Sequence, residues 1–431
     1  MGTAKIKYTS KKAYMQLINS IAFYPFLIAF SLLALAWLTA YLDNIKVGGA
    51  LLSKASFLSI DNANTARSLL SSLLSGLISL VTFTFAMVMI VLTQVTSSFS
   101  PRLLPNLLSK RGSQVVLGTI VGTICFTMVV LSNVQTMSGG PEVPRLSMMI
   151  NLFLGFACVL SFIYFIHKIS NEIQIGNILN SQYRATRDSL DRELNSGNYH
   201  EDWEEQEGQY LVKAWDSGYF DTITEPQFKN GSSKLGLTTT LLKNQGMYLL
   251  KGEPFLKMNK PMNKEIQELV EENILFRHQE MVEENFVYGF KLLTEVAVKA
   301  LSPGINDPGT AMQAIDYLLD LLCRLQALRG RKVIKKDGVA RLVYQPVPFE
   351  TIFRICTASI RAYSSTDVAV QARLIDLISK VSARDERKKH TALFAKELKS
   401  IEEASSKEMK SQEDIDFIKA LVQNARQEYK L

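Results

Sequence analysis

The chain has 431 residues, of which 47% are hydrophobic and 21% charged, and its formal net charge is +7 at pH 7. So apolar a composition excludes intrinsic disorder, and the length predicts two to four domains. The first 170 residues contain twelve Lys and Arg against three acidic residues, so the basic excess lies in the most hydrophobic part of the chain. A nucleic-acid binder concentrates its basic charge on a soluble face, so we expect no nucleic-acid partner.

Four apolar stretches occur in that first part, at about 21–42, 69–95, 115–134 and 148–166. Each contains about the 20 residues that a helix needs to cross the hydrocarbon of a bilayer. The first stretch is too long for the apolar core of a signal peptide and lacks a clean cleavage site, so we expect a retained anchor. The sequence therefore predicts a transmembrane domain of four helices over 1–168, with the lipid bilayer as its partner.

The basic residues that flank these stretches predict the orientation. One side carries eight of them: Lys5, Lys7, Lys11, Lys12, Arg102, Lys110, Arg111 and Lys168. The other side carries four: Lys46, Lys54, Arg67 and Arg145. Because short cytoplasmic segments hold the excess of Lys and Arg, both termini are expected in the cytoplasm.

The rest of the chain then forms a cytoplasmic α+β region. Residues 169–208 are expected to form a juxtamembrane helix, at 171–194, and a linker. Short strand-like runs over 209–260, separated by Gly, Asn and Pro, predict a small β-barrel or sandwich. Residues 261–431 are expected to be mainly helical, as a bundle, with one or two helices over 263–301, a hairpin at 331–344, and helices near 348–362, 366–382, 388–404 and 412–429.

The second apolar stretch carries small and hydroxyl side chains at alternating spacings of mostly four and three. They are Ser68, Ser72, Ser75, Ser79, Thr82, Ala86, Met89, Thr93 and Ser97. This spacing places them on one face of a transmembrane helix. Such a face serves close helix–helix packing, or it lines a pore around the axis of an oligomer. The two hypotheses are compatible if only part of the face meets water.

No Asp, Glu, Lys, Arg or His lies inside the four predicted spans, which disfavours a proton-coupled pump. The third span contains Gly118 and Gly122 as a GxxxG motif, a weak signal of close packing. Between spans two and three, Arg102, Lys110 and Arg111 either only follow the positive-inside rule or also surround a cytoplasmic mouth that favours anions.

A polar, rigid block interrupts the helical part of the cytoplasmic region. It consists of Ser302, Pro303, Gly304, Ile305, Asn306, Asp307 and Pro308. The structural hypothesis is a turn between helices, in which Asp307 is the N-cap of a helix that begins at Pro308 and runs to about residue 328. The functional hypothesis is a ligand or subunit contact.

Neither metal nor cofactor chemistry is indicated by the sequence. The four cysteines and four histidines lack ligand spacing, so we expect free thiols and no metal site. No nucleophile elbow, phosphate-binding loop, dinucleotide fingerprint or zinc-protease motif occurs. We therefore expect no cofactor and no enzymatic activity.

Two long motifs give a resemblance to a known family. They are SSFSPRLLPNLLSKRGSQVVLGTIVGT, which follows the second span and runs into the third, and YGFKLLTEVAVKALSPGINDPGTAMQAIDYL. The chain resembles a bacterial family of predicted membrane proteins, catalogued as domain of unknown function 2254, over most of its length. Members of that family often have a Gln-Asp pair shortly before the aromatic-Gly step, whereas this chain has Glu283, Glu284 and Asn285 there. The resemblance implies a bacterial inner-membrane architecture and no particular activity.

Together these observations predict a homo-oligomeric channel or conduit for ions or small solutes, with a cytoplasmic domain that assembles or gates it. The alternative is a membrane-anchored scaffold or sensor without a permeation path, in which the hydroxyl face is buried dry between the helices of one subunit.

Overall fold

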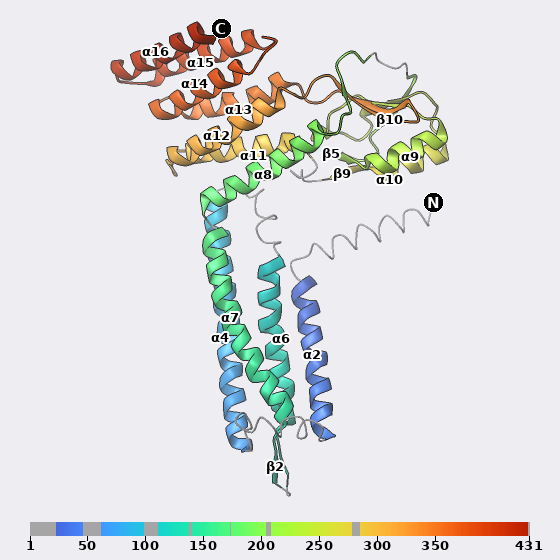
Figure 1. Ribbon diagram of the computed structural model, residues 1–431, viewed down its shortest axis with the longest axis vertical. Coiled ribbons are helices and arrows are strands. Elements are labelled where there is room, and N and C mark those ends of the chain that lie inside the picture. The colour runs from blue at the N-terminus through green and yellow to red at the C-terminus, as the bar shows by residue number, and fades with distance from the viewer. Residues whose placement is uncertain are drawn as a thin grey trace. The chain divides into compact units, whose positions relative to one another are not determined.

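The computed structural model describes residues 23–45, 62–98, 111–137, 140–172, 174–203, 208–277 and 285–429. The chain forms two compact units, Met1–Gln174 and Ile175–Leu431. The first is the membrane unit and the second the α+β unit. Both are shown in Figure 1.

The membrane unit consists of four long helices, each apolar and long enough to cross a membrane, which confirms the four predicted spans. Two strands of three residues, β1 and β2, form an antiparallel hairpin between the last two helices. The bounds of these elements are α2 Phe23–Asn44, α4 Ala63–Ser98, α6 Arg111–Asn133, β1 Gln135–Met137, β2 Gly140–Glu142 and α7 Arg145–Glu172.

Helix α6 is the centre of this unit, because it packs against α2, α4 and α7. The GxxxG motif forms its contact with α2. A Cβ atom at Gly118 would lie 2.8 Å from the Cα of Pro25, and one at Gly122 would lie 3.0 Å from the Cα of Ala29. The absence of side chains at these two glycines therefore permits the backbones to approach closely, as the motif predicts.

Polar contacts join the helix ends of the membrane unit. The Asp43 carboxylate, at the end of α2, accepts hydrogen bonds from Leu146 N (3.0 Å), Ser147 N (2.9 Å) and Ser147 Oγ (2.7 Å). Asp43 thus satisfies backbone N–H groups at the first turn of α7, which have no partner within their own helix. The Arg67 guanidinium donates to the carbonyl of Val134, just after α6 (2.8 Å).

The α+β unit contains two open sheets. The six-stranded sheet has the order β3-β10-β11-β6-β8-β4, and the three-stranded sheet has the order β7-β5-β9. The bounds are β3 Tyr199–His200, β4 Tyr210–Lys213, β5 Gly218–Ile223, α9 Glu225–Leu235, β6 Thr239–Leu241, β7 Tyr248–Leu249, β8 Pro254–Met258, α10 Lys264–Asn273, β9 Ile274–Arg277, β10 Arg331–Lys336 and β11 Val339–Tyr344.

For the segment 209–260 the sequence predicted a small β-barrel or sandwich, and no closed barrel is present in the described residues. Within the described ranges the strands of that segment are divided between the two sheets, and neither sheet closes on itself. Residues of both sheets contribute to one hydrophobic core, which includes Val212, Phe220 and Phe255. The six-stranded sheet is completed by the distant hairpin β10–β11, because β11 pairs in parallel with β6. The barrel or sandwich was predicted from local runs alone, whereas this pairing joins segments about a hundred residues apart.

Seven further helices lie in the described part of the α+β unit. They are α8 Ile175–Leu194, α11 Phe286–Ala300, α12 Pro308–Leu325, α13 Phe349–Tyr363, α14 Val368–Ala383, α15 Thr391–Glu408 and α16 Gln412–Tyr429. Helix α11 packs against α8, α12 and α13, and α14 packs against α12, α15 and α16. The predicted helical segments are thus confirmed, except that strand β9 interrupts the segment 263–301. Its residues pair with β5.

Candidate functional site

The hydroxyl face of α4 lies on the outside of the membrane unit. Eight of its nine predicted residues are exposed: Ser68, Ser72, Ser75, Ser79, Thr82, Ala86, Met89 and Thr93. The side chain of Ser97 lies outside the described residues. The face therefore meets no other helix within the described part of this chain.

The opposite side of α4 makes the contacts with the rest of the unit. Leu70 is fully buried, and Leu77 and Thr84 are 3% and 2% exposed. Since successive residues of an α-helix turn by about 100°, these three positions lie on nearly the opposite side from the hydroxyl face. Helix α4 packs against α6 and α7 through this buried side, and in Figure 1 it runs beside α7.

Four hydroxyl groups of the exposed face donate hydrogen bonds within their own helix. Ser75 Oγ donates to Ser71 O and Ser79 Oγ to Ser75 O, both at 2.9 Å. Thr82 Oγ1 donates to Ile78 O (3.0 Å) and Thr93 Oγ1 to Met89 O (2.9 Å). Each donor is therefore satisfied, while the hydroxyl oxygen keeps lone pairs for water or a solute.

The basic residues proposed for a cytoplasmic mouth lie at the edge of the described ranges. Arg102 and Lys110 lie outside the described residues. Arg111 is the first residue of α6, and its side chain also lies outside them.

The block 302–308 forms a tight connection between α11 and α12. Asp307 accepts a hydrogen bond from Thr310 N (3.1 Å), so it caps α12 as predicted, and Pro308 is the first helical residue. Ser302 Oγ donates to Lys299 O (2.7 Å), and Asn306 has a positive φ of 49°. Asn and Asp adopt this left-handed conformation more readily than most residues. The contacts of Ser302 and Asp307 are thus those of a structural turn.

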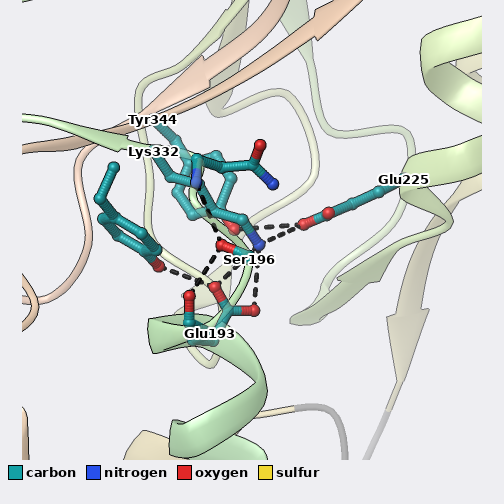
Figure 2. Close-up of polar contacts among 7 residues, drawn as sticks. Glu193, Ser196, Glu225, Lys332 and Tyr344 are labelled. Atoms are coloured by element: carbon teal, nitrogen blue, oxygen red, sulfur yellow. Dashed lines mark hydrogen bonds and ion pairs between the residues drawn. The ribbon is translucent and has the colours of Figure 1, made fainter.

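A buried cluster of charged and phenolic side chains lies in the α+β unit (Figure 2). The Lys332 side chain, on β10, is only 2% exposed. Its Nζ lies 2.8 Å from Glu193 Oε2, near the end of α8, and 2.6 Å from Glu225 Oε1, the first residue of α9. Two tyrosines complete the cluster: Tyr199 Oη donates to Glu193 Oε2 (2.7 Å) and Tyr344 Oη to Glu225 Oε1 (3.4 Å).

Local structure holds these groups in place. Ser196 Oγ donates to the backbone oxygen of Glu193 (2.7 Å), which fixes the end of α8. Glu225 stands at the N-terminus of α9, where the helix dipole favours a carboxylate. The hairpin that carries Lys332 and Tyr344 turns at Asp337 and Gly338, which both have positive φ angles, 54° and 75°. Asp-Gly is a preferred sequence for such a two-residue turn.

Burial and charge perturb the ionisation of this cluster. Burial by itself lowers the pKa of Lys332, but the negative charges of Glu193 and Glu225 outweigh it, so the net shift is upward. Burial, reinforced by the same two carboxylates, raises the pKa of Tyr344 well above its usual value. Burial and the charge of Glu193 likewise raise the pKa of Tyr199. The lysine is therefore charged and both phenols are protonated at neutral pH.

A pocket of about 40 Å³ lies beside the cluster. Glu193, Tyr199 and Tyr344 form part of its wall. Asn244, Gln245, Asn285 and Gln345 also line it. This cluster could not be predicted from the sequence, because the partners of Lys332 are 139 and 107 residues away.

Within the described ranges, no group of three or more His, Cys, Asp or Glu side chains is arranged to hold a metal ion. The four cysteines, Cys125, Cys158, Cys323 and Cys356, are free thiols. Burial raises the pKa of Cys356 to about 12, so this thiol is inert at neutral pH.

Four apolar helices followed by an α+β unit define the class of this chain as a multi-pass membrane protein. The family model described as "Predicted membrane protein (DUF2254)" matches residues 18–380, and the chain belongs to that family. This establishes the family that the two long sequence motifs indicated.

Curated relatives occur in mycobacteria. The uncharacterized protein Rv1290c of Mycobacterium tuberculosis and the uncharacterized protein Mb1321c of Mycobacterium bovis are each 24% identical to this chain over 336 residues. The matches cover 74% of this chain and 64% of each relative, so the chain spans less than two thirds of the relatives' length. No solved structure matches the chain.

Proposed function

We propose that the protein is a homo-oligomeric conduit for ions or small solutes in the bacterial inner membrane, with both termini in the cytoplasm. The α+β unit would then assemble or gate the path, and transport would be passive, without enzymatic activity. The proposal rests mainly on the orientation of one face of α4.

That face supports the proposal because it is polar yet turned away from α6 and α7. In a single chain surrounded by lipid, a row of hydroxyl groups on the outside of a helix has no polar surroundings. Copies of α4 arranged around a symmetry axis would turn the same face toward water. The uncharged lining suits a passive path, since pumps place ionisable groups within their spans.

The ends of the path suggest its selectivity. If Arg102, Lys110 and Arg111 surround the cytoplasmic mouth, their positive charge favours anions. Chloride is therefore the first permeant ion to test.

A scaffold or sensor without a permeation path is the second candidate. One observation favours it: the hydroxyl groups of Ser75, Ser79, Thr82 and Thr93 already donate to the backbone of α4. A helix face whose donors are satisfied needs no water, and it tolerates lipid or a tightly packed second helix.

Reconstitution into liposomes tests the choice between them. We expect wild-type protein to conduct chloride or another small ion, and Ser79→Trp to reduce the flux at least tenfold. Ile78→Trp is the matched control, because Ile78 is also exposed on α4 (48%) but lies outside the hydroxyl face. Absence of flux at every voltage and pH, with oligomers intact, would reject the conduit and leave the scaffold.

Cysteine cross-linking tests the oligomer directly. Ser75→Cys and Ser79→Cys should form disulfide-linked dimers in membranes, whereas Phe83→Cys, exposed beside the face, should not. Wild-type protein controls for the four native thiols. Equal cross-linking at all three positions would show random collision in the membrane rather than a defined interface.

A further inference from the structure

A buried row of polar side chains lies between α6 and α7, inside the membrane unit. Thr127 Oγ1 on α6 lies 2.9 Å from Asn151 Oδ1 on α7. About two turns further along α7, the Cys158 thiol donates to Thr123 Oγ1 (3.3 Å). These four side chains are each 0% exposed. The row is therefore enclosed by protein, unlike the exposed hydroxyl face of α4.

The side-chain amide of Asn151 is only half satisfied. Its Nδ2 group is fully buried and has no hydrogen-bond partner among the described residues. The single hydroxyl hydrogen of Thr127 also reaches the carbonyl oxygen of Thr123, at 2.7 Å. If it goes there, the Asn151 amide fits Thr127 equally well when turned over, with Nδ2 donating to Thr127 Oγ1. Turning the amide over replaces the unpartnered donor by a carbonyl oxygen at the same place.

The surroundings of this amide indicate what completes it. Hydrocarbon supplies no hydrogen-bonding groups, so a polar group inside a membrane protein needs a partner from the protein or from bound water. Water suits both orientations of the Asn151 amide, because it donates and accepts hydrogen bonds, and buried waters typically bind polar groups of this kind. The neighbouring Thr123 and Thr127 are uncharged, so they do not compensate the charge of an ion.

The polar row begins at one end of the membrane unit and stops inside it. Ser147 lies one turn before Asn151 on the same face of α7, and its Oγ donates to the partly exposed Asp43 at the end of α2 (2.7 Å). From Ser147 to Cys158 the row covers about 16 Å of α7, roughly half of the hydrocarbon thickness. Beyond Cys158, α7 contributes the buried apolar side chains of Phe165 and Ile169. The row is therefore suited to hold water from the Asp43 end, without forming a complete path.

We propose that a water molecule binds between α6 and α7 at the Asn151 amide, and that it extends the hydrated Asp43 end of the membrane unit inward to Thr127. The α6–α7 contact is then wet at this position, whereas the contact of α6 with α2 at Gly118 and Gly122 is dry and close. The inference does not rest on the conduit, because the site lies between two helices of one chain.

Hydroxyl-radical footprinting by X-ray radiolysis tests the proposal on the full-length protein in detergent. The radicals form from water in place, so a buried methionine is oxidised quickly only where water is bound beside it. Met148 is the reporter, because it is 2% exposed and lies about one turn before Asn151 in α7. We expect Met148 to be oxidised several times faster than Met258, which is 1% exposed in the hydrophobic core of the α+β unit. Equally slow oxidation of both methionines would overturn the proposal.

Two variants connect the oxidation to the amide. Asn151→Leu removes the amide and should reduce the oxidation of Met148 to the rate of Met258. Asn133→Leu makes the same change at an amide that already donates to Val129 O (2.8 Å), so it is the matched control and should leave the oxidation of Met148 unchanged. Unchanged oxidation of Met148 in Asn151→Leu would contradict the proposed site.

Thermal unfolding of the same variants gives a second readout. If water satisfies the Asn151 amide, Asn151→Leu should be no more stable than the wild type, because leucine gains nothing from removing a hydrogen-bonded group. An amide buried dry and without a partner destabilises the fold, so its replacement by leucine would raise Tm. A rise in Tm of several degrees in Asn151→Leu, absent from Asn133→Leu, would therefore reject the bound water, whatever the outcome of the flux measurements.

Discussion

Replacing Lys332 by methionine should destabilise the α+β unit strongly. The side chain is 2% exposed, and its ammonium group contacts Glu193 and Glu225 at 2.8 and 2.6 Å. Methionine fills a similar volume but removes the positive charge. Two carboxylates then face each other, at 27% and 31% exposure, without the cation between them. Removing one partner of a buried ion pair typically costs about 3–5 kcal/mol.

The geometry gives a similar magnitude. Because both contacting oxygens lie within 3 Å of one Nζ atom, they are at most about 5.5 Å apart. At an effective dielectric constant near 20, two negative charges at that distance repel by about 3 kcal/mol. Protonating a glutamate carboxyl relieves the repulsion, at a cost of about 3.7 kcal/mol at pH 7 and about 1 kcal/mol at pH 5. We therefore expect Lys332→Met to lower the free energy of unfolding by about 3 kcal/mol at pH 7 and by about 1 kcal/mol at pH 5.

Urea titration of the full-length protein in detergent, followed by tryptophan fluorescence, measures this difference. Lys335→Met is the matched control, because Lys335 is exposed on the same strand and contacts the Trp203 ring at 5.1 Å, an interaction of about 0.5–1 kcal/mol. Adding Glu225→Gln to Lys332→Met should restore most of the loss. A loss below 1 kcal/mol at pH 7, or a loss that does not shrink at pH 5, would refute the electrostatic argument.

Three further predictions concern the two units separately. First, folding raises the pKa values of Lys332 and Tyr344, so the stability that these two groups contribute is complete below about pH 10 and is lost as the pH rises through their pKa values in the folded protein. The urea midpoint of unfolding should therefore fall between pH 9 and 12, and it should fall less steeply in Tyr344→Phe. Second, Asp43→Ala removes three hydrogen bonds at the start of α7 and should cost about 2–3 kcal/mol in an SDS-unfolding titration, with Asp43→Asn intermediate. Third, Gly118→Ala should lower Tm by several degrees, because its Cβ would meet the backbone of α2 at 2.8 Å, while Gly76→Ala, with open space around it, should not.

Elements that depend on local signals could be predicted from the sequence. The four membrane helices follow from uninterrupted apolar runs, because lipid offers no other way to satisfy the backbone. The start of α12 follows from Asp307 and Pro308, whose effect needs only the next turn of the chain. The hairpin β10–β11 follows from its Asp-Gly turn. In each case the physical cause lies within a few residues.

Elements that depend on distant contacts could not be predicted. Strand β9 lies in a segment with a helical pattern and exists because β5 pairs with it. The burial of Lys332 depends on two carboxylates more than a hundred residues away, and nothing near β10 indicates them. For α4, the spacing grouped the hydroxyl residues on one face but could not determine whether that face turned toward α6 or away from it.

The hydroxyl face of α4 contains an apolar section that bears on gating. Between Thr82 and Thr93, the only residues that belong to the hydroxyl face are Ala86 and Met89. About 16 Å of the helix therefore presents no hydroxyl group to the proposed path. Narrow apolar sections of a pore lose their water and close it to ions. In the proposed oligomer, Met89→Ser should therefore raise the basal ion flux in liposomes at least severalfold, whereas Phe85→Ser, exposed on α4 outside the hydroxyl face, should leave it unchanged. Equal flux in the wild type and Met89→Ser would show that ions do not pass this section of α4.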